Sequence, residues 1–354
     1  PRDATFLSNS DKVAQPASFP LSYPKHMNSA YGIIWLQPGS NAMTGGSTEF
    51  GECRIALTEA IAVRRCPARA GTKGAMTIME AAPRSQVADH YARGSLVADI
   101  RDGLAAMGKT ESTVTAEDLS PVDEFHIGGR AATAELAAQL ALTAGDRLLD
   151  IGCGLGGPAR QIAAHYGCQV TGIDLTRDYV EAGNVLSGWL HLKERVSLQQ
   201  GDALALPFAD ASFTAAYMLH VGMNIADKSA LFSEVARVLR PGARFGVYDV
   251  MRTGAGELSY PLPWASMADT NAIAAPEQYR DALSTAGFEI LSERQRRDVA
   301  LAYFARQRAQ AATGPAVLGV QTLMGARRPQ MVRNMSESIS AGLIAPVEIV
   351  ARRR

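Results

Sequence analysis

A glycine-rich turn is the first feature of the chain that suggests chemistry. A short apolar run at 147–151 contains Asp150 and predicts a strand, and a helix is predicted to begin at Gly157. Three glycines lie between them at alternate positions, Gly152, Gly154 and Gly156. Because glycine has no Cβ, the backbone here can take open conformations and approach a ligand closely. The following helix points unpaired N–H groups at the same place, so the run predicts a cofactor-binding turn.

Two classes of cofactor fit this turn when it is taken alone. Gly152, Gly154 and Gly157 satisfy the GxGxxG spacing of dinucleotide-binding enzymes. Asp174, at the end of the next predicted strand, suits the ribose hydroxyls of either cofactor. The glycines therefore leave open an NAD(P)-dependent oxidoreductase, which we keep as the alternative function.

Four further features favour S-adenosylmethionine. Asp150 directly precedes the glycines and suits the ammonium group at the methionine end of that cofactor better than a pyrophosphate. Asp202, in a Gly-Asp-Ala run after the third predicted strand, is placed to accept from an adenine amino group. The segment 206–213 leads into the fourth strand, and the segment 237–242 ends the next helix in Arg-Pro-Gly. Each carboxylate also has a structural interpretation, as the brace of a turn or the cap of a helix.

In this order the motifs resemble those of the class I S-adenosylmethionine-dependent methyltransferases of type 11, which include ubiquinone/menaquinone and sarcosine/dimethylglycine methyltransferases. The resemblance covers the chain from about Asp123 to its end. It implies a Rossmann-like α/β fold, with a seven-stranded, mostly parallel sheet whose last strand, at 345–351, runs antiparallel. It also implies S-adenosyl-L-methionine as cofactor and in-line methyl transfer to a nitrogen, oxygen or carbon nucleophile of a small molecule. Ala243 departs from the pattern, which usually has a second glycine there, in a turn remote from the cofactor.

The resemblance implies a cofactor-binding role for nine residues: Asp150, Gly152, Gly154, Gly156, Asp174, Leu175, Asp202, Ala203 and His220. The glycines line the methionine part of the cofactor, and Asp174 binds the ribose. Leu175 packs on the adenine, and the Asp202-Ala203 pair meets the adenine edge. A member of the fold that binds without catalysis is a third possibility. Loss of the cofactor carboxylates would favour it, but Asp174 and Asp202 are present.

Six residues are predicted around the methyl acceptor: Tyr91, His126, His220, Asn224, Tyr260 and Trp264. His220 follows the fourth strand, and an ordinary histidine pKa of about 6.5 suits a general base, although packing beside the cofactor is the alternative. In similar enzymes the segment that holds His126 folds over the cofactor, and a hydrogen-bonded loop histidine is the alternative for this residue. Tyr91 is predicted to close the same site from an N-terminal helix. Asn224 either orients the acceptor or caps the next helix.

Further candidate walls of the acceptor site lie in the segments inserted around the last strands. They are Tyr260, Trp264, Met267, Tyr303, Met324 and Met331, for which ordinary packing is the alternative. The segment 297–341, between the sixth and seventh predicted strands, is the candidate lid.

The chain divides into three parts by composition and pattern. Residues 1–75 are rich in Ser, Gly, Pro and Asn and lack periodicity, which predicts a disordered extension or sequence upstream of the natural start. Residues 76–130 are predicted as a helical cap, and 131–354 as the methyltransferase domain. Alternating strands and helices predict an α/β sheet covered on both faces.

The predicted elements follow from apolar periodicity, glycine and proline. Helices are expected at 84–107 with a break near Gly94, then at 131–142, 157–166, 178–190, 228–239, 276–286, 299–312 and 329–340. Strands are expected at 147–151, 169–173, 196–200, 213–219, 244–250, 288–294 and 345–351. A loop is expected at 117–121.

Charge and cysteine usage exclude several function classes. Lys+Arg and Asp+Glu number 35 each, which argues against a nucleic-acid partner. Four cysteines, at Cys53, Cys66, Cys153 and Cys168, form no zinc-ligand spacing, so no metal is predicted and a reducing cytoplasmic location fits. No apolar stretch reaches the ~18 residues of a membrane span. The prediction is an enzyme acting on a small molecule, as a monomer or homodimer.

Overall fold

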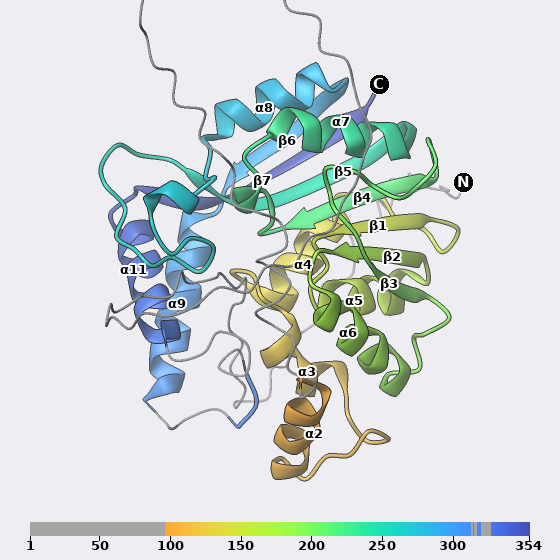
Figure 1. The fold of residues 1–354 in the computed structure, drawn as a ribbon, viewed down its shortest axis with the longest axis vertical. Coiled ribbons are helices and arrows are strands. Elements are labelled where there is room, and N and C mark those ends of the chain that lie inside the picture. The colour runs from red at the N-terminus through yellow and green to blue at the C-terminus, as the bar shows by residue number, and fades with distance from the viewer. Residues whose placement is uncertain (1–95, 313, 315–316, 320–326) are drawn as a thin grey trace, which may run out of the picture.

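A computed structural model describes residues 96–312, 314, 317–319 and 327–354 (Figure 1). The predicted extension at 1–75 lies outside the described residues, as do Tyr91, Met324 and the first half of the helix predicted at 84–107.

Seven strands form one sheet in the order β3-β2-β1-β4-β5-β7-β6. Their bounds are β1 (Arg147–Ile151), β2 (Gln169–Asp174), β3 (Val196–Gln200), β4 (Phe213–Leu219), β5 (Leu239–Arg252), β6 (Phe288–Gln295) and β7 (Ile344–Arg353). The first five strands pair in parallel, whereas β7 runs antiparallel to both β5 and β6. The predicted fold class, including the antiparallel last strand, is confirmed.

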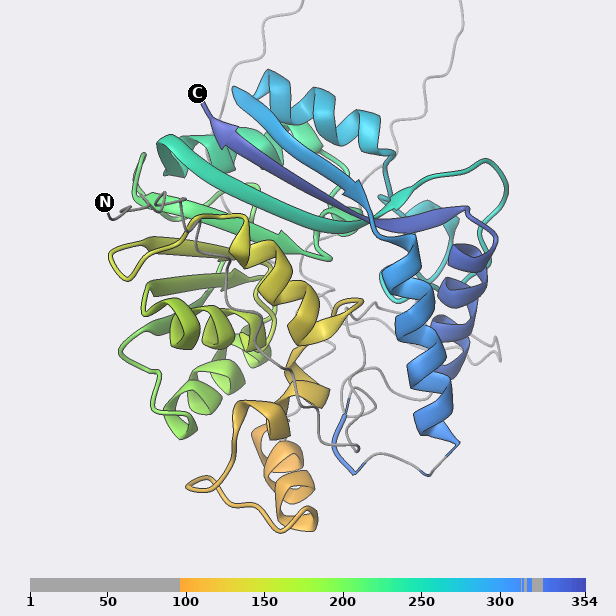
Figure 2. The ribbon, with the colours of Figure 1, turned by 180° about the vertical axis from the view of Figure 1, so that it is seen from behind.

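Helices cover both faces of this sheet (Figures 1 and 2). The described helices are α2 (Leu96–Ala106), α3 (Ala116–Asp123), α4 (Gly129–Ala138), α5 (Gly157–Tyr166), α6 (Arg177–Trp189), α7 (Lys228–Val238), α8 (Pro276–Thr285), α9 (Arg297–Ala311) and α11 (Arg328–Ser340). Strand alternation divides the core, because Leu149 packs toward α7 and α8 while Leu148 packs toward α4 and α5. The helices α9 and α11 lie side by side beyond the β6 and β7 end of the sheet.

The loop predicted at 117–121 is wrong, because these residues belong to α3. Thr115 and Asp118 form a capping box: the Asp118 carboxylate accepts from the Thr115 amide at 2.9 Å, and the Thr115 hydroxyl accepts from the Asp118 amide at 3.3 Å. This start signal prevails over Pro121, which lies inside the helix. The predicted helix at 131–142 is too long, since α4 ends at Ala138 and Ala141 has a φ of +55°.

A buried ion pair fixes the segment that precedes α4. Arg160 of α5 donates to the Asp123 carboxylate at 2.6 Å, and the two side chains are 1% and 4% exposed. The same guanidinium donates to the Gly183 carbonyl at 3.0 Å and to the Ser187 hydroxyl at 3.2 Å. One side chain therefore joins α3, α5 and α6 below the glycine turn.

The Arg160→Ala variant is expected to lower the free energy of unfolding by about 3–5 kcal/mol, because it leaves the Asp123 carboxylate buried without its partner. Arg177→Ala is the matched control, since Arg177 also pairs with a carboxylate, that of Glu181, but both side chains are exposed. That pair is expected to contribute about 0.3–0.5 kcal/mol. Urea unfolding of both variants measures the difference, and equal losses would contradict the proposed importance of the buried pair.

Candidate functional site

The glycine turn lies at the carboxyl end of β1 and is crowded by its neighbours. Gly152, Gly154 and Gly156 have φ values of +70°, +52° and +77°. A Cβ on Gly152 would lie 2.3 Å from a methyl carbon of Val221, and one on Gly154 would lie 3.4 Å from the Phe125 ring. All three glycines are thus favoured by the backbone conformation, and Gly152 is required by close approach as well, whereas 3.4 Å at Gly154 is an ordinary contact distance.

Asp174 joins the end of β2 to this turn. One carboxylate oxygen accepts from the Gly154 amide and the other from the Thr176 amide, each at 2.9 Å. The side chain is half-buried, and burial raises the pKa of its carboxyl against the lowering effect of these hydrogen bonds. Each oxygen keeps a lone pair for a ligand hydroxyl. Leu175 follows with its side chain 52% exposed, which provides an apolar surface next to that position.

Asp150 is held from the neighbouring strand. Tyr217 of β4 stands opposite Asp150 in the sheet, and its hydroxyl donates to the Asp150 carboxylate at 2.6 Å. Asp150 is 2% exposed, and burial raises the pKa of its carboxyl to about 7, although the Tyr217 hydrogen bond opposes the shift. Sequence patterning missed Tyr217, since its ring continues an apolar strand and only its hydroxyl is polar. Only the pairing of β1 with β4 places Tyr217 opposite Asp150 and indicates its role.

Asp202 and Ala203 lie in the turn that follows β3. The Asp202 carboxylate accepts from the Leu204 amide at 2.8 Å, and both residues are half-buried. The turn thus has the brace predicted as the structural interpretation, and Asp202 remains a prediction as an adenine contact.

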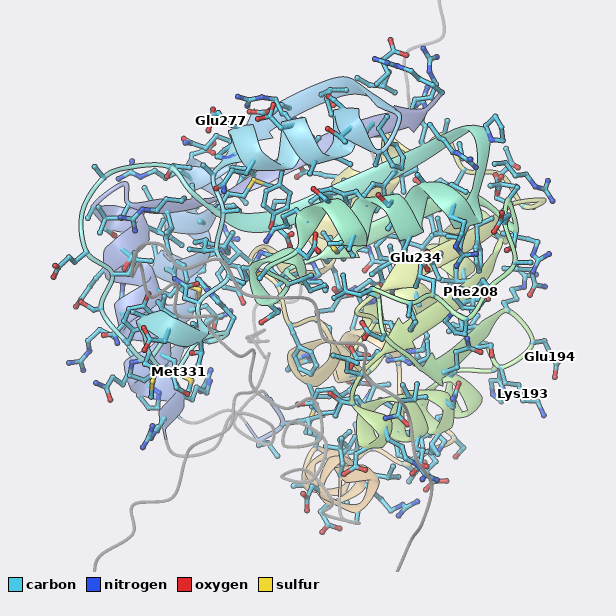
Figure 3. All side chains as sticks on the ribbon, turned by 45° about the horizontal axis from the view of Figure 1, so that its top comes forward. Lys193, Glu194, Phe208, Glu234, Glu277 and Met331 are labelled. Carbon is cyan, nitrogen blue, oxygen red and sulfur yellow. The ribbon has the colours of Figure 1, made fainter. Side chains whose placement is uncertain are left out.

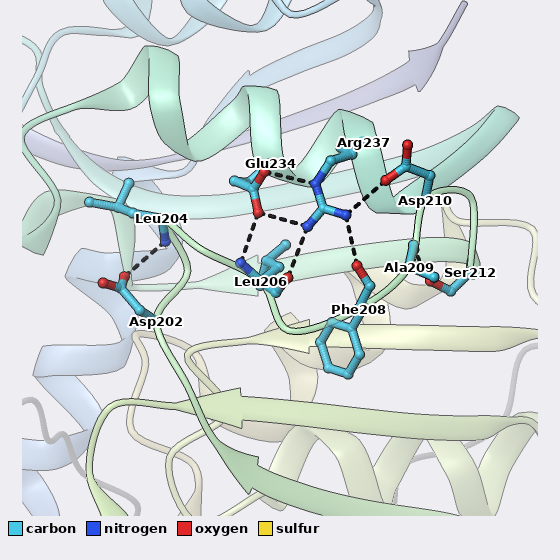
Figure 4. A network of polar contacts seen from close by, with 9 residues as sticks. All are labelled: Asp202, Leu204, Leu206, Phe208, Ala209, Asp210, Ser212, Glu234 and Arg237. Carbon is cyan, nitrogen blue, oxygen red and sulfur yellow. Dashed lines mark hydrogen bonds and ion pairs between the residues drawn. The ribbon is translucent and has the colours of Figure 1, made fainter.

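The segments 206–213 and 237–242, which the sequence analysis singled out, are joined by the guanidinium of Arg237 (Figure 4). Arg237 of α7 donates to the Leu206 and Phe208 carbonyls at 2.8 and 2.7 Å, and to the carboxylates of Asp210 and Glu234 at 2.9 and 2.8 Å. Glu234 in turn accepts from the Leu206 amide at 2.8 Å. The segment that follows Asp202 is therefore fixed to α7 by a single network.

The two predicted histidines come together at the end of β4. Their ring centroids are 6.0 Å apart in a T-shaped contact, and His220 stacks on Tyr248 with centroids 5.4 Å apart. His220 is 4% exposed, and burial, together with the nearby His126, moves its pKa well below the ordinary value. Nε2 of His220 has no hydrogen-bond partner in the part of the chain that the structure describes.

His126 is buried under α4 and tightly held. Its Nε2 lies 3.1 Å from both the Gly129 carbonyl oxygen and the Thr133 hydroxyl. Burial lowers the pKa of His126 to about 4. Sequence reasoning missed Thr133 and the fully buried Glu124 behind it, although Glu124 directly precedes the Phe125-His126 pair. The His126 ring thus contacts the rings of His220 and Tyr248, while its Nε2 faces α4.

The other predicted acceptor residues lie in two places: Asn224 follows β4, whereas Tyr260 and Trp264 lie in an apolar cluster. Asn224 lies in the short helix η1 (Gly222–Asn224), where its amide donates to the Val221 carbonyl at 3.0 Å. Its proposed role as a helix cap is wrong, because Asp227 caps α7 by accepting from the Ala230 amide at 2.8 Å. The capping position falls three residues later than the sequence suggested.

Tyr260 and Trp264 belong to an apolar cluster with α9 and α11. Asn271 bridges the two, since its amide donates to the Tyr260 hydroxyl at 2.9 Å and its oxygen accepts from the indole at 2.8 Å. Buried members of this cluster include Ile127, Met223, Tyr303, Phe304, Met331 and Met335. Met267 is 44% exposed and is not part of it. These side chains pack against one another, and contact with an acceptor stays a prediction for Tyr260 and Trp264.

The predicted cofactor residues and this cluster occupy different ends of the sheet. Asp150, Asp174 and Asp202 lie on or directly after β1, β2 and β3, whereas α9 and α11 contact β7. Figure 3 shows Met331 of α11 far across the molecule from Phe208. His220, at the end of β4, lies between the two regions.

Neither a metal-ligand cluster nor a helical membrane span occurs in the part of the chain that the structure describes. No group of three or more His, Cys, Asp or Glu side chains there is arranged to hold a metal ion. None of the described helices combines the length and the hydrophobicity that a membrane span needs.

Comparison with known proteins agrees with this geometry. Residues 149–247 match the family described as a methyltransferase domain. O-methyltransferase resE of Aspergillus sclerotiorum is 36% identical over 156 residues, which cover 44% of this chain and 57% of that protein. The chain thus spans little more than half the length of this curated relative.

Solved structures show the same fold. Geranyl diphosphate C-methyltransferase from Streptomyces coelicolor, solved with S-adenosyl-L-homocysteine, is 23% identical with a TM-score of 0.53, over 63% of this chain and 80% of that one. The 4+2 cyclase SpnF is 25% identical with a TM-score of 0.57, and the match covers 76% of this chain and 96% of that one. None of these supports the oxidoreductase alternative. Residues 149–247, which include the glycine turn, are thus similar to a methyltransferase domain, and the chain has the fold of these solved structures.

Proposed function

We propose that this protein transfers a methyl group from S-adenosyl-L-methionine to a nitrogen, oxygen or carbon atom of a small molecule. One observation carries the proposal: Asp174 binds the amide of Gly154, so the carboxylate for a ribose and the open backbone for a methionine part form one unit. The matched methyltransferase domain includes both residues.

The residues at this edge fit the cofactor. The glycine turn leaves out the Cβ atoms that would fill the space beside Val221 and Phe125. Asp174 has lone pairs for the ribose hydroxyls, and the exposed Leu175 side chain offers an apolar surface for the adenine. Asp150 would hold the ammonium group. Asp202 and Ala203 would meet the adenine edge.

The chain's own contribution to the reaction is position, exclusion of water and proton removal. When bound, S-adenosyl-L-methionine supplies a methyl group on a sulfonium, which is a good leaving group. Burial of His220 keeps its imidazole neutral near pH 7, so Nε2 is ready to take a proton from an acceptor that must lose one. Orientation of the acceptor and exclusion of water supply the rest.

We assign the acceptor to the region between His220 and the apolar cluster of α9 and α11. The segment 297–341 holds both helices and is our proposed lid. Tyr260 and Trp264 would contact the acceptor from the segment between β5 and α8. The apolar character of this cluster favours an acceptor with a sizeable apolar part.

We also propose a cytoplasmic location and a small molecule, rather than nucleic acid, as the partner. The described cysteines, Cys153 and Cys168, are free thiols, which fits a reducing cytoplasm. Equal numbers of basic and acidic residues argue against nucleic acid as a partner. A monomer or homodimer is our expectation for assembly.

Incubation with labelled S-adenosylmethionine and panels of amines, phenols and quinones tests the reaction. We expect label in at least one acceptor, and calorimetric binding of S-adenosylhomocysteine without binding of NADH. The likeness to a cyclase shows that the fold also serves other chemistry, so binding alone does not suffice. Binding of S-adenosylhomocysteine without transfer to any acceptor would favour a role other than methyl transfer, and tight binding of NADH alone would favour the oxidoreductase.

The Gly152→Ala variant is expected to lose S-adenosylhomocysteine binding by at least about tenfold. Its Cβ would collide with Val221 and displace the turn, in addition to the strain of a φ of +70°. Gly242→Ala is the matched control, because Gly242 has a φ of +82° but nothing within 4 Å of the added Cβ. Alanine adopts a positive φ in both variants and so causes similar backbone strain. A difference in S-adenosylhomocysteine affinity between them therefore reports the local effect at Gly152. Equal affinity in the two variants would contradict this account.

Cofactor binding is expected to strengthen as the pH rises through about 7. The Asp150 carboxyl has a pKa raised to about 7, and only its ionised form, present above that pKa, attracts the ammonium group. Tyr217→Phe removes a donor that stabilises the ionised form, so the midpoint moves to higher pH. Calorimetry with S-adenosylhomocysteine between about pH 6 and 8 measures it.

Tyr279→Phe is the control for this shift. Tyr279 is also buried and donates to a carboxylate, that of Asp249, at 3.0 Å. The midpoint is expected to stay in place in that variant, and an equal shift in both variants would argue against the role given to Asp150.

A further inference from the structure

A glycine inside α2 marks a close contact with the connection between α9 and α11. An added Cβ on Gly103 would lie 2.7 Å from Cδ1 of Leu318, a residue of that connection. Glycine weakens a helix relative to alanine. Its presence inside α2 is accounted for by the Leu318 side chain, which occupies the space where a Cβ would stand.

Leu318 is buried among side chains of the N-terminal helices and of α6. It is 3% exposed, although its neighbour Val317 is 58% exposed. The buried members of this group, here called the cap cluster, include Ile100, Leu104, Leu119, Leu155, Tyr179 and Leu186. Leu155 belongs to the glycine turn. The apolar group that receives Leu318 therefore includes a residue of the predicted cofactor turn.

Phe125 joins the cap cluster to the apolar cluster of α9 and α11. Its side chain packs against both clusters, and its ring centroid lies 6.3 Å from that of Tyr179. An added Cβ on Gly154 would lie 3.4 Å from the same ring. A continuous series of apolar side chains thus runs beside the glycine turn, from Leu318 to the proposed acceptor region.

Leu318 connects helices that pack toward opposite ends of the sheet. The helices α9 and α11 contact β7, near one end, whereas α2 contacts α6, which packs on β3 at the other end. Figure 2 shows α2, in orange, apart from α9 and α11, in blue. The strands that carry the glycine turn and Asp174 lie between these two ends. The contact of Leu318 with α2 therefore joins parts of the chain on both sides of the predicted cofactor residues.

We propose that Leu318 is a latch, whose contact with α2 holds the lid closed over the bound cofactor, and that S-adenosyl-L-homocysteine leaves after this contact opens. This inference rests on the proposed function, which supplies the identity of the ligand. The contact is between apolar side chains, so it opens without separating charges. In many enzymes the opening of a lid sets the rate of product release. The closed latch also keeps water from the site during transfer.

A disulfide tests the contact without any ligand. The added Cβ on Gly103 would lie 3.4 Å from Cβ of Leu318, near the roughly 3.5–4.5 Å that disulfides span. The variant with Gly103→Cys and Leu318→Cys is expected to form the bond on mild oxidation, detected by mass spectrometry of the linked peptides. Gly188→Cys with Leu318→Cys is the matched control, because Gly188 also lies on a helix but has nothing within 4 Å of an added Cβ. No bond in the first pair, or equal yields in both pairs, would overturn the latch.

The locked protein tests release. Labelled S-adenosyl-L-homocysteine is bound to the variant with Gly103→Cys and Leu318→Cys, the protein is oxidised, and loss of label is followed by rapid filtration after dilution into excess unlabelled ligand. We expect the dissociation rate to fall at least about tenfold on oxidation and to recover on addition of reductant. Recovery distinguishes the effect of the bond from misfolding.

Removal of the Leu318 side chain tests the opposite state. Leu318→Ala is expected to raise the dissociation rate of S-adenosyl-L-homocysteine at least about tenfold, because loss of a buried side chain weakens the closed form. Val317→Ala is the matched control, since the neighbouring Val317 side chain is largely exposed. Its rate should equal that of the unaltered protein. An unchanged rate in Leu318→Ala would contradict the latch.

These outcomes are distinct from the test of methyl transfer. Equal dissociation rates in the oxidised and reduced proteins would overturn the latch and leave the proposed function in place. A locked protein that retains S-adenosyl-L-homocysteine would support the latch even if the unaltered protein methylates no acceptor, a result that overturns the proposed function alone. Failure of the unaltered protein to bind S-adenosyl-L-homocysteine would overturn both.

Discussion

The space available to the backbone at residues 152–157 is the constraint on which the rest of the site depends. Side chains come close to this turn from three directions: Val221 above Gly152, Phe125 beside Gly154 and Leu198 at Gly156. These contacts come from β3, from the end of β4 and from the segment between α3 and α4. A Cβ at the first or third of these glycines would displace at least one of these neighbours. Fixing the turn thus also fixes the position of His220, which directly precedes Val221.

Buried charge is the second constraint, and the structure meets it with fixed donors. Arg160 neutralises Asp123 below the turn, and Tyr217 donates to Asp150 within the sheet. Backbone amides supply both partners of Asp174. Glu124 is the exception, because only one of its oxygens has a partner among the described residues. Glu124 thus keeps one carboxylate oxygen without a hydrogen bond in the described part of the chain, and burial raises its pKa to about 8.

The sequence was sufficient for the elements that depend on local pattern. The bounds of β1, β3 and β4 agree with the prediction residue by residue, since apolar runs between glycine and charged residues define buried parallel strands. The helix α3 was predicted as a loop, although the capping box of Thr115 and Asp118 is a local signal for a helix start. The roles of Tyr217 and Thr133 could not be predicted, because each depends on a partner that only the folded chain brings within reach: Asp150 lies 67 positions away in one case and Glu124 nine in the other.

His220 shows how these constraints meet at one residue. Its φ of +56° is uncommon for a residue with a Cβ and costs on the order of 1 kcal/mol or more, so the surrounding contacts must enforce it. The His220 amide donates to the Tyr248 carbonyl at 2.8 Å, and the two rings stack. The next two amides, of Val221 and Gly222, donate to the Asp249 carboxylate. The end of β4 is thus held to β5 by successive bonds, which stop the strand and turn the imidazole toward His126. A strained backbone at the junction between the predicted cofactor residues and the apolar cluster agrees with the fixed base that we propose there.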